Sequence, residues 1–125
     1  MPRTIVSAEG IAKAPAVYSH AVSCAGLVFV SGTAPHDATG QIVGTTIQEQ
    51  TAQSLRNITT ILKAAGTTLD KAVSATVILA DEDDFAGMNE EWVKWFPIDP
   101  PARQGAKLPV RVPGLKISIA MIAEA

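Results

Sequence analysis

The residue with the clearest chemical potential is Arg103, which follows the sequence Pro-Pro-Ala and precedes a run that favours a β-strand. A guanidinium at such a stiff boundary offers two parallel N–H donors, a geometry that matches a planar carboxylate. The alternative role is an ion pair on the surface or between subunits, and the local sequence leaves both roles open. Gly105 and Lys107 follow at even spacing, so a strand would place them on the same face as Arg103.

The other reactive side chains do not form a metal or nucleophile pattern. The single cysteine, Cys24, excludes an internal disulfide, and the two histidines, His20 and His36, leave too few ligands for a zinc site of the usual type. We therefore expect neither a metal nor a cofactor, and we interpret these residues as inert or hydrogen-bonded groups. The acidic run at 82–84 is interpreted as a helix cap and a solvated surface.

The composition describes a folded chain without an obvious macromolecular partner. The 125 residues predict one domain over 1–125, and a hydrophobic fraction of 47% excludes intrinsic disorder. The net charge of −2 argues against a broad basic surface for nucleic acid. No apolar run reaches the ~18 residues of a membrane span, and the N-terminus lacks the pattern of a secretory signal, so we expect a cytoplasmic protein.

Short β-branched or apolar runs predict the strands of a sheet. Such runs lie at 17–23, 27–32, 41–43, 72–80, 103–112 and 115–123. The first two flank a Gly-containing connection that is typical of a hairpin. Pro109 indicates that the 103–112 strand is bulged or at an edge, and Val112–Leu115 predicts a turn with Gly114 at the position that needs a positive φ.

Two apolar stripes at helical spacing predict the helices. Thr46 and Glu49 form a capping box and Gly66 closes the pattern, which predicts a first helix over 46–65. A second helix is expected from about Asp81 to the prolines that begin at Pro97. Its stripe is interpreted as core or subunit contact rather than as a substrate box: Phe85, Met88, Trp92 and Trp95 or Phe96. Helices segregated from an antiparallel or mixed sheet predict a two-layer α+β fold with both helices on one face.

These motifs, in this order and at this spacing, resemble the RidA/YjgF family over nearly the whole chain. The segments that carry the resemblance are Tyr18–Val22, Leu27–Gly32, Thr39–Gly44, Gln50–Ile58, Ala64–Gly66, Asp84–Phe85 with Asn89, Pro101–Arg103 and Lys116–Ala123. The resemblance implies a chorismate-mutase-like fold and a homotrimer with three clefts between subunits. Those clefts would bind a small carboxylate-bearing metabolite without a cofactor.

The resemblance also implies an activity, the hydrolysis of 2-imino or enamino acids of the 2-iminobutanoate and 2-iminopropanoate type to 2-keto acids and ammonia. Arg103 matches the family's signature arginine and would hold the substrate carboxylate. Ser31 and the backbone of Gly32 match the strand end that lines the cleft, and Tyr18 and Asn89 match its tyrosine and asparagine. Without the resemblance, Gly32 reads as a turn glycine, Tyr18 as a core residue with its hydroxyl at the rim, and Asn89 as a loop anchor.

Several features depart from the family pattern. Ala120 occupies the position at which deaminating members carry a glutamate that is thought to orient the hydrolytic water. Gly105, a further substrate-binding candidate, replaces a frequent cysteine, and the segment 96–101 is shorter than in well-studied deaminases. Lys107 and Arg111 add positive charge nearby, which leads to the hypothesis of a cleft suited to a dicarboxylate or a larger anion.

The sequence leaves three functions open. The first is the deaminase, and since general acid–base help is worth about 10²–10⁴-fold, the loss of the glutamate predicts a slower enzyme rather than an inactive one. The second, which Ala120 favours, is a trimeric carboxylate-binding or regulatory paralogue without catalysis. The third is RNA cleavage or inhibition of translation, against which the net charge and the lack of a His and acid pair both argue. His36, after the cleft-lining strand, would lie at the cleft mouth.

Overall fold

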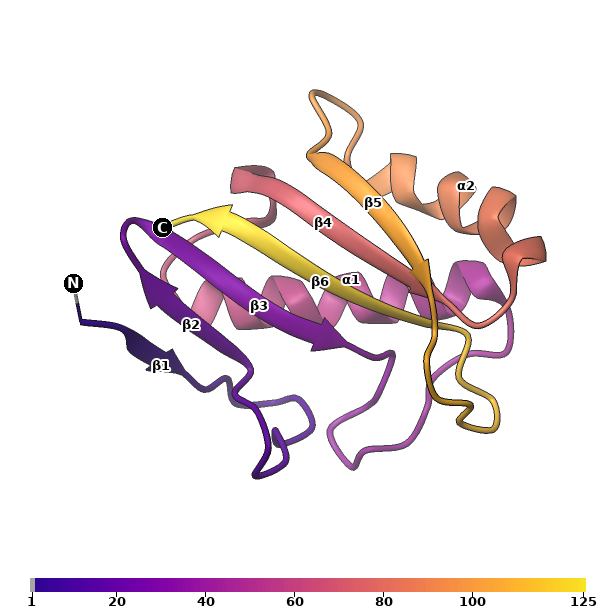
Figure 1. Ribbon diagram of the computed structural model, residues 1–125, viewed down its shortest axis with the longest axis horizontal. Helices are drawn as coiled ribbons and strands as arrows, with labels where there is room; N and C mark the ends of the chain where they lie inside the picture. The colour runs from indigo at the N-terminus through magenta and orange to yellow at the C-terminus, as the bar shows by residue number, and fades with distance from the viewer. Residues whose placement is uncertain (1) are drawn as a thin grey trace.

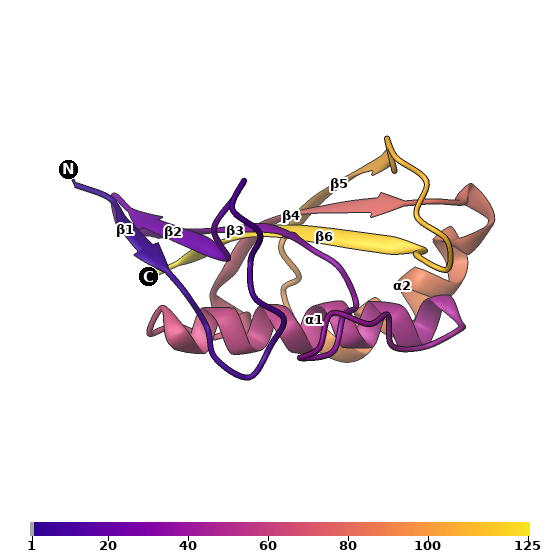
Figure 2. The same ribbon diagram turned by 90° about the horizontal axis from the view of Figure 1, so that it is seen from below.

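The chain folds into two layers, in which two α-helices cover one face of a six-stranded sheet (Figure 1, Figure 2). The computed structural model describes residues 2–125. The strands are β1 Thr4–Val6, β2 Ala21–Cys24, β3 Leu27–Thr33, β4 Ala72–Leu79, β5 Ala102–Lys107 and β6 Ile117–Glu124. The helices are α1 Ile47–Ala64 and α2 Phe85–Trp95, with short 3₁₀ turns at Leu69–Lys71 and Glu82–Asp84. This arrangement confirms the α+β fold that the sequence predicts.

The strand order β1-β2-β3-β6-β4-β5 makes the sheet mixed. Neighbouring strands are antiparallel except β4 and β5, which are parallel because α2 carries the chain back between them. The last strand, β6, therefore lies inside the sheet, and β5 forms one edge. Figure 1 shows β5 beside α2, on the far side of the sheet from β1. A residue on β5 thus has a sheet neighbour on one side only.

Helix α1 begins and ends as the sequence predicts. The Thr46 hydroxyl accepts a hydrogen bond from the Glu49 backbone N–H at 3.1 Å, and the Glu49 carboxylate accepts one from the Thr46 N–H at 3.0 Å. These bonds satisfy free N–H groups at the helix start. Gly66, at φ +87°, continues the chain in the left-handed conformation that follows many helices. Within residues 2–125, no helix is both long and apolar enough to cross a membrane.

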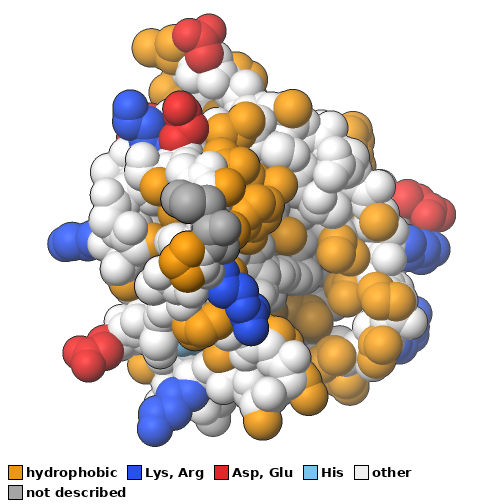
Figure 3. All heavy atoms as spheres, turned by 60° about the vertical axis from the view of Figure 1, so that its left-hand side comes forward, with side chains coloured by type: hydrophobic (Ala, Val, Ile, Leu, Met, Phe, Trp, Pro, Cys, Tyr) orange, Lys and Arg blue, Asp and Glu red, His pale blue; other side chains and the backbone are white. Residues whose placement is uncertain are grey.

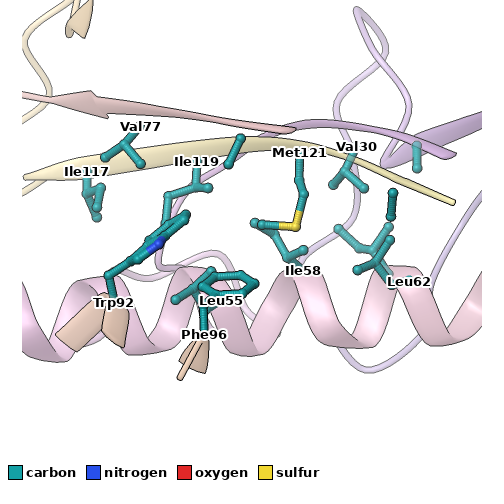
Figure 4. Packing of buried hydrophobic residues seen from close by; sticks show 14 of the residues in the cluster. Val30, Leu55, Ile58, Leu62, Val77, Trp92, Phe96, Ile117, Ile119 and Met121 are labelled. Carbon is teal, nitrogen blue, oxygen red and sulfur yellow. The ribbon is translucent and has the colours of Figure 1, made fainter. Parts of the chain in front are cut away.

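The core lies between α1 and the helix-facing side of the sheet. Leu55, Ile58 and Leu62 project from α1 towards Ile119 and Met121 of β6, and all five side chains are at most 2% exposed (Figure 4). The sequence produces this contact because the α1 residues recur at three- and four-residue spacing, while alternate residues of β6 face the same side. The core therefore fixes the position of β6 and of the strands on either side of it.

Several strand predictions are corrected by the structure. The run 41–43 forms no strand and contributes only an isolated bridge between Ile42 and His36. The strand expected over 103–112 ends at Lys107, because its parallel partner β4 ends at the opposing residue, Leu79. Arg111 consequently lies in the loop after β5 and not in a strand.

The ends of the sheet hold one more difference and one agreement. The sequence predicts no strand at β1, which is only three residues long and pairs with β2. The last two strands are not neighbours, since β4 lies between β5 and β6. The turn that precedes β6 is confirmed, because the Leu115 N–H donates to the Val112 carbonyl at 3.0 Å and Gly114 has φ +82°.

The helix-free face of the sheet carries an apolar row. Ile5, Val22, Phe29 and Ile122 oppose one another in register across β1, β2, β3 and β6. Ile5 and Phe29 are 52% and 41% exposed, although both are large apolar side chains. Figure 3, which brings the β1 side of the molecule forward, shows hydrophobic side chains gathered around a hollow, with most charged side chains at the margins. Such a surface is typical of a protein contact.

Candidate functional site

Arg103 is the one partly buried residue of β5, whose other five residues are exposed. Its guanidinium carbon lies 5.1 Å from the centre of the Trp92 ring and 5.7 Å from that of Phe85. Its Nη1 lies 3.5 Å from the sulfur of Met88. These three residues come from one face of α2, so the helix holds the guanidinium through aromatic and sulfur contacts. This packing leaves most of the guanidinium N–H donors unused.

Arg103 also has no acidic partner among the described residues. Within residues 2–125, none of the three ion pairs involves an arginine, since all three use lysines. Burial lowers the pKa of Arg103 below its ordinary value, although arginine still stays charged at neutral pH. A partly desolvated cation without a counter-charge is unfavourable. A bound anion would supply the missing charge.

The Arg103 guanidinium borders an open pocket of about 570 Å³ between β4, β5 and α2. Its walls are mainly apolar and include Val77, Leu79, Phe85 and Met88. Phe85 remains 53% exposed at the pocket, whereas Met88 is buried beneath it. A concave apolar surface with few polar groups is the usual form of a small-molecule site. We call this feature the Arg103 pocket.

The strand pairing gives the Arg103 pocket its direction. Arg103, Gly105 and Lys107 lie opposite Ala75, Val77 and Leu79 of β4 and line the pocket, which confirms that they share a face. Lys107 Nζ lies 3.3 Å from the carboxylate of Glu82 at the end of the pocket away from Arg103. The midpoint is Gly105, where an added Cβ would lie 3.3 Å from the Val77 carbonyl oxygen.

A second, smaller pocket of about 80 Å³ lies at the end of β3. It is lined by Tyr18, Ser31 and Gly32, among others. Tyr18 is 52% exposed, and the Ser31 hydroxyl donates a 2.6 Å hydrogen bond to the Ser19 carbonyl. An added Cβ at Gly32 would lie 3.0 Å from the Ser118 hydroxyl, so glycine also prevents crowding there. We call this feature the β3 pocket.

Buried polar groups of the β3 pocket are satisfied within the chain. The Ala8 N–H donates to His20 Nδ1 at 3.0 Å, and His20 Nε2 lies 2.8 Å from the Ala12 carbonyl, to which it donates. Asn57 Nδ2 donates to the carbonyls of Ala34 and His36 at 3.2 and 2.8 Å. Both ring nitrogens of His20 are therefore used to hold the segment before β2, as expected for a structural histidine.

The structure divides the candidate site residues. Arg103 and Gly105 line the Arg103 pocket, while Tyr18, Ser31 and Gly32 line the β3 pocket. Two strands, β6 and β4, separate β3 from β5, which corresponds to about 14 Å at the usual strand spacing.

Two further residues of interest line neither pocket. Asn89 is half-buried on α2. Ala120 lies opposite Thr76, on the helix-free face of the sheet. The position that departs from the family pattern is therefore outside both pockets of the single chain.

Three residues around Arg103 have roles that sequence reasoning missed. Glu82 was interpreted as a cap, and Phe85 and Met88 as core or subunit contacts, yet all three line the Arg103 pocket. Their spacing of three residues is the local signal, with Glu82 in the 3₁₀ turn and Phe85 and Met88 on one face of α2. That face meets β5 because of the parallel crossover, which local periodicity does not specify.

Comparisons with known proteins agree on one family. A sequence model described as "Endoribonuclease L-PSP" matches residues 11–125. The chain is 41% identical over 109 residues to the mitochondrial protein mmf2 of Schizosaccharomyces pombe, covering 85% of this chain and 86% of that protein. It is 39% identical over 116 residues to the 2-iminobutanoate/2-iminopropanoate deaminase of Capra hircus, covering 90% and 85%. The solved structure of E. coli TdcF with bound serine matches with a TM-score of 0.88 at 28% identity, covering 98% of both chains.

Proposed function

Since this chain belongs to the endoribonuclease L-PSP family, also called RidA/YjgF, we propose that it hydrolyses 2-imino or enamino acids to 2-keto acids and ammonia. The family includes a relative named for the deamination of 2-iminobutanoate and 2-iminopropanoate, which supports this reaction class. In our proposal Arg103 binds the substrate carboxylate, and no cofactor takes part.

The observation that carries the proposal is the unpaired guanidinium of Arg103. It is partly buried, held by Trp92 and Met88, and directed at an open pocket without an acid to neutralise it. A planar carboxylate fits the guanidinium through two parallel hydrogen bonds. Every 2-imino acid carries a carboxylate next to the reacting carbon, so binding at Arg103 places that carbon at the pocket wall.

The chemical step requires few protein groups. The oxygen of a water molecule forms a bond to the electrophilic imine carbon, and a proton moves from that water to the nitrogen. The C–N bond of the resulting aminoalcohol then breaks as its hydroxyl proton passes to the departing nitrogen, so ammonia leaves and the 2-keto acid is the other product. Arg103 contributes by fixing the substrate next to the water, which removes orientational entropy from the barrier.

The complete site in our proposal lies between the subunits of a homotrimer. Tyr18, Ser31 and Gly32 lie in a different pocket from Arg103, and a neighbouring copy would bring the two sets together. Asn89 would line the same cleft. The apolar row on the helix-free face, which includes Phe29, provides a surface for such contacts.

The assembly can be tested separately from the chemistry. Light scattering should give the mass of a trimer of the 13.1 kDa chain. Phe29→Glu places a charge in the apolar row and should yield monomers that lack activity, because each cleft is then incomplete. A monomeric wild-type protein, or a monomeric variant with full activity, would contradict the intersubunit site.

The direct test of deamination uses competition for imines. An amino-acid oxidase generates 2-imino acids in the presence of semicarbazide, and the protein should reduce the amount of trapped product. Arg103→Ala should lower this activity by about 10²-fold, the value of a charge-assisted hydrogen bond of about 3 kcal/mol. Arg56→Ala is the matched control, because Arg56 is an exposed arginine on α1 and lines neither pocket. Equal trapping with and without wild-type protein would overturn the proposal.

A second candidate function is a carboxylate-binding or regulatory role without catalysis. Ala120 favours it, because the glutamate expected at this position would help to position the water. Glu82 is the acidic residue of the Arg103 pocket, and its carboxylate pairs with Lys107. Binding of a 2-keto acid at Arg103 together with an absence of imine hydrolysis would support this candidate over the enzyme.

A further inference from the structure

We propose that the Arg103 pocket selects substrates with a large apolar side chain, of which an aromatic ring fits best. This inference rests on the proposed function, in which Arg103 holds the carboxylate of a 2-imino acid. The side chain of the substrate then lies along β5, over Gly105, and against Val77 and Phe85.

The first argument is the size of the pocket. Its volume of about 570 Å³ lies within the ~300–1,000 Å³ range of small-molecule sites. The carboxylate and imine of a three- or four-carbon substrate would fill only the Arg103 end. Val77, Leu79 and Phe85 would then stay in contact with water. A longer apolar side chain covers these walls, and the removal of apolar surface from water favours binding.

The second argument is the direction of the pocket. Arg103, Gly105 and Lys107 follow one another on the same face of β5, so the pocket extends along the strand away from the guanidinium. Four residues of strand span about 13 Å. A carboxylate bound at Arg103 therefore leaves a straight path for the rest of the molecule, towards the pair of Glu82 and Lys107.

The third argument is the glycine at the middle of this path. Gly105 has no positive φ that would require glycine, so its lack of a side chain matters for space and not for the backbone. An added Cβ would already approach the Val77 carbonyl oxygen at 3.3 Å, and larger side chains would extend over the pocket floor. The glycine thus keeps the central part of the pocket open.

The far end of the pocket argues against a second carboxylate on the ligand. Lys107 is the cation of the pocket lining there, but the Glu82 carboxylate lies 3.3 Å away, in an ion pair whose two side chains are exposed. A dicarboxylate would have to displace or approach Glu82 and meet repulsion. The exposed ring of Phe85 instead offers a stacking surface for an aromatic group. These charges and contacts favour an aromatic side chain over an acidic one.

The experiment compares three 2-keto acids that differ only in side chain, with oxaloacetate prepared fresh because it decarboxylates to pyruvate in solution. Binding of pyruvate, phenylpyruvate and oxaloacetate is measured by calorimetry, and kcat/KM is measured for the imines of alanine, phenylalanine and aspartate. We expect phenylpyruvate to bind at least ~10-fold more tightly than pyruvate, with the same preference in kcat/KM, and oxaloacetate to gain no such advantage.

Gly105→Val tests the position of the side chain. It should reduce the phenylalanine-to-alanine ratio of kcat/KM by ~10-fold or more, because valine occupies the path over the strand. Ala102→Val is the matched control, since Ala102 is exposed on the same strand and does not line the pocket, and its ratio should stay at the wild-type value. Phe85→Ala, at an exposed position that tolerates truncation, should also lower the ratio.

The outcomes separate this inference from the proposed function. Tight phenylpyruvate binding without imine hydrolysis would remove the enzyme and leave the selectivity in place. Hydrolysis with equal kcat/KM for the alanine and phenylalanine imines, or with a preference for the aspartate imine, would overturn the inference alone. A ratio unchanged in Gly105→Val, with a folded trimer by circular dichroism and light scattering, would overturn it as well.

Discussion

The Arg103 pocket and the β3 pocket differ in how their polar groups are satisfied. In the β3 pocket, His20 and Asn57 direct their hydrogen bonds to backbone groups of the same chain. In the Arg103 pocket, the guanidinium contacts rings and a sulfur but no acid. A buried polar group that is satisfied internally stabilises the fold, whereas one without a partner is available to a ligand. The difference supports a structural role for His20 and Asn57 and the proposed binding role for Arg103, while Tyr18, Ser31 and Gly32 of the β3 pocket stay part of the proposed intersubunit cleft.

Substitutions of satisfied and of unpaired polar groups should change different quantities, namely the stability of the fold and the affinity for a ligand. Removal of a satisfied group leaves its backbone partners unpaired and costs stability. Removal of an unpaired cation relieves a desolvation penalty and costs binding instead. The predictions below therefore measure stability and ligand affinity together for residues of each pocket.

The largest expected effect is on binding at Arg103. Arg103→Met keeps an unbranched apolar side chain next to α2 but removes the guanidinium and its charge. Affinity for phenylpyruvate should fall by about 10²-fold, while the free energy of unfolding in urea should stay equal or rise slightly, because the desolvated cation is gone. A clear loss of stability with retained affinity would show that Arg103 belongs to the fold rather than to the site.

The next effect is on stability at Asn57. Asn57→Ala removes the donors to the Ala34 and His36 carbonyls and should lower the free energy of unfolding by about 1–3 kcal/mol. Arg56→Ala, at the adjacent exposed position of α1, should change it by less than about 0.5 kcal/mol. Urea denaturation followed by circular dichroism measures both. Equal stability of the two variants would remove the structural role of the β3 pocket.

A smaller effect is expected at His20. His20→Leu deletes both hydrogen bonds to the segment before β2, but that segment lies near the surface, where water can replace them in part. We expect a loss of about 1 kcal/mol. Exchange of the Ala8 amide hydrogen should also become faster, and protection as in the wild type would argue that this bond is not formed in solution.

The smallest effect concerns pH and the start of α1. Hydrogen bonds from the Thr46 and Thr45 backbones lower the pKa of Glu49 below its ordinary value. Because the folded pKa is lower than the unfolded one, the contribution to stability is complete above the unfolded value of 4.5 and is lost as the pH falls through the folded value. Glu49→Gln keeps the capping geometry without titration, so its stability should fall less between pH 7 and pH 3. Parallel curves for both proteins would contradict this.

The parts of the fold that sequence predicts well are those set by local rules. Helix α1 follows from Thr46, Glu49 and Gly66, and the β2–β3 hairpin follows from its Gly-containing turn, in which Ala25 and Gly26 both have positive φ. The strand over 103–112 was predicted too long, because Val110 and Val112 continue its apolar alternation while no partner strand exists beyond Leu79. Strand β1 escaped prediction because three residues become a strand only through pairing.

The sequence singles out candidate site residues but does not show how they group in space. Arg103 stands out by type and context, but the rings around it belong to a helical stripe that also suits a core. Arg103 contacts these rings because α2 carries the chain from β4 to β5. The local sequence does not specify this crossover. The order of the strands likewise determines that Tyr18 and Gly32 lie apart from Arg103 within one chain. In our proposal they come together only when the chains form a trimer.

The most direct measurement sets Arg103→Met against Asn57→Ala in the same two assays. Both variants and the wild type are measured for affinity to phenylpyruvate and for the free energy of unfolding. We predict opposite results for the two variants. Arg103→Met should lose affinity and keep its stability, whereas Asn57→Ala should lose stability and keep its affinity. If Arg103→Met binds as tightly as the wild type, the unpaired guanidinium is not a carboxylate site, and the distinction between the two pockets fails.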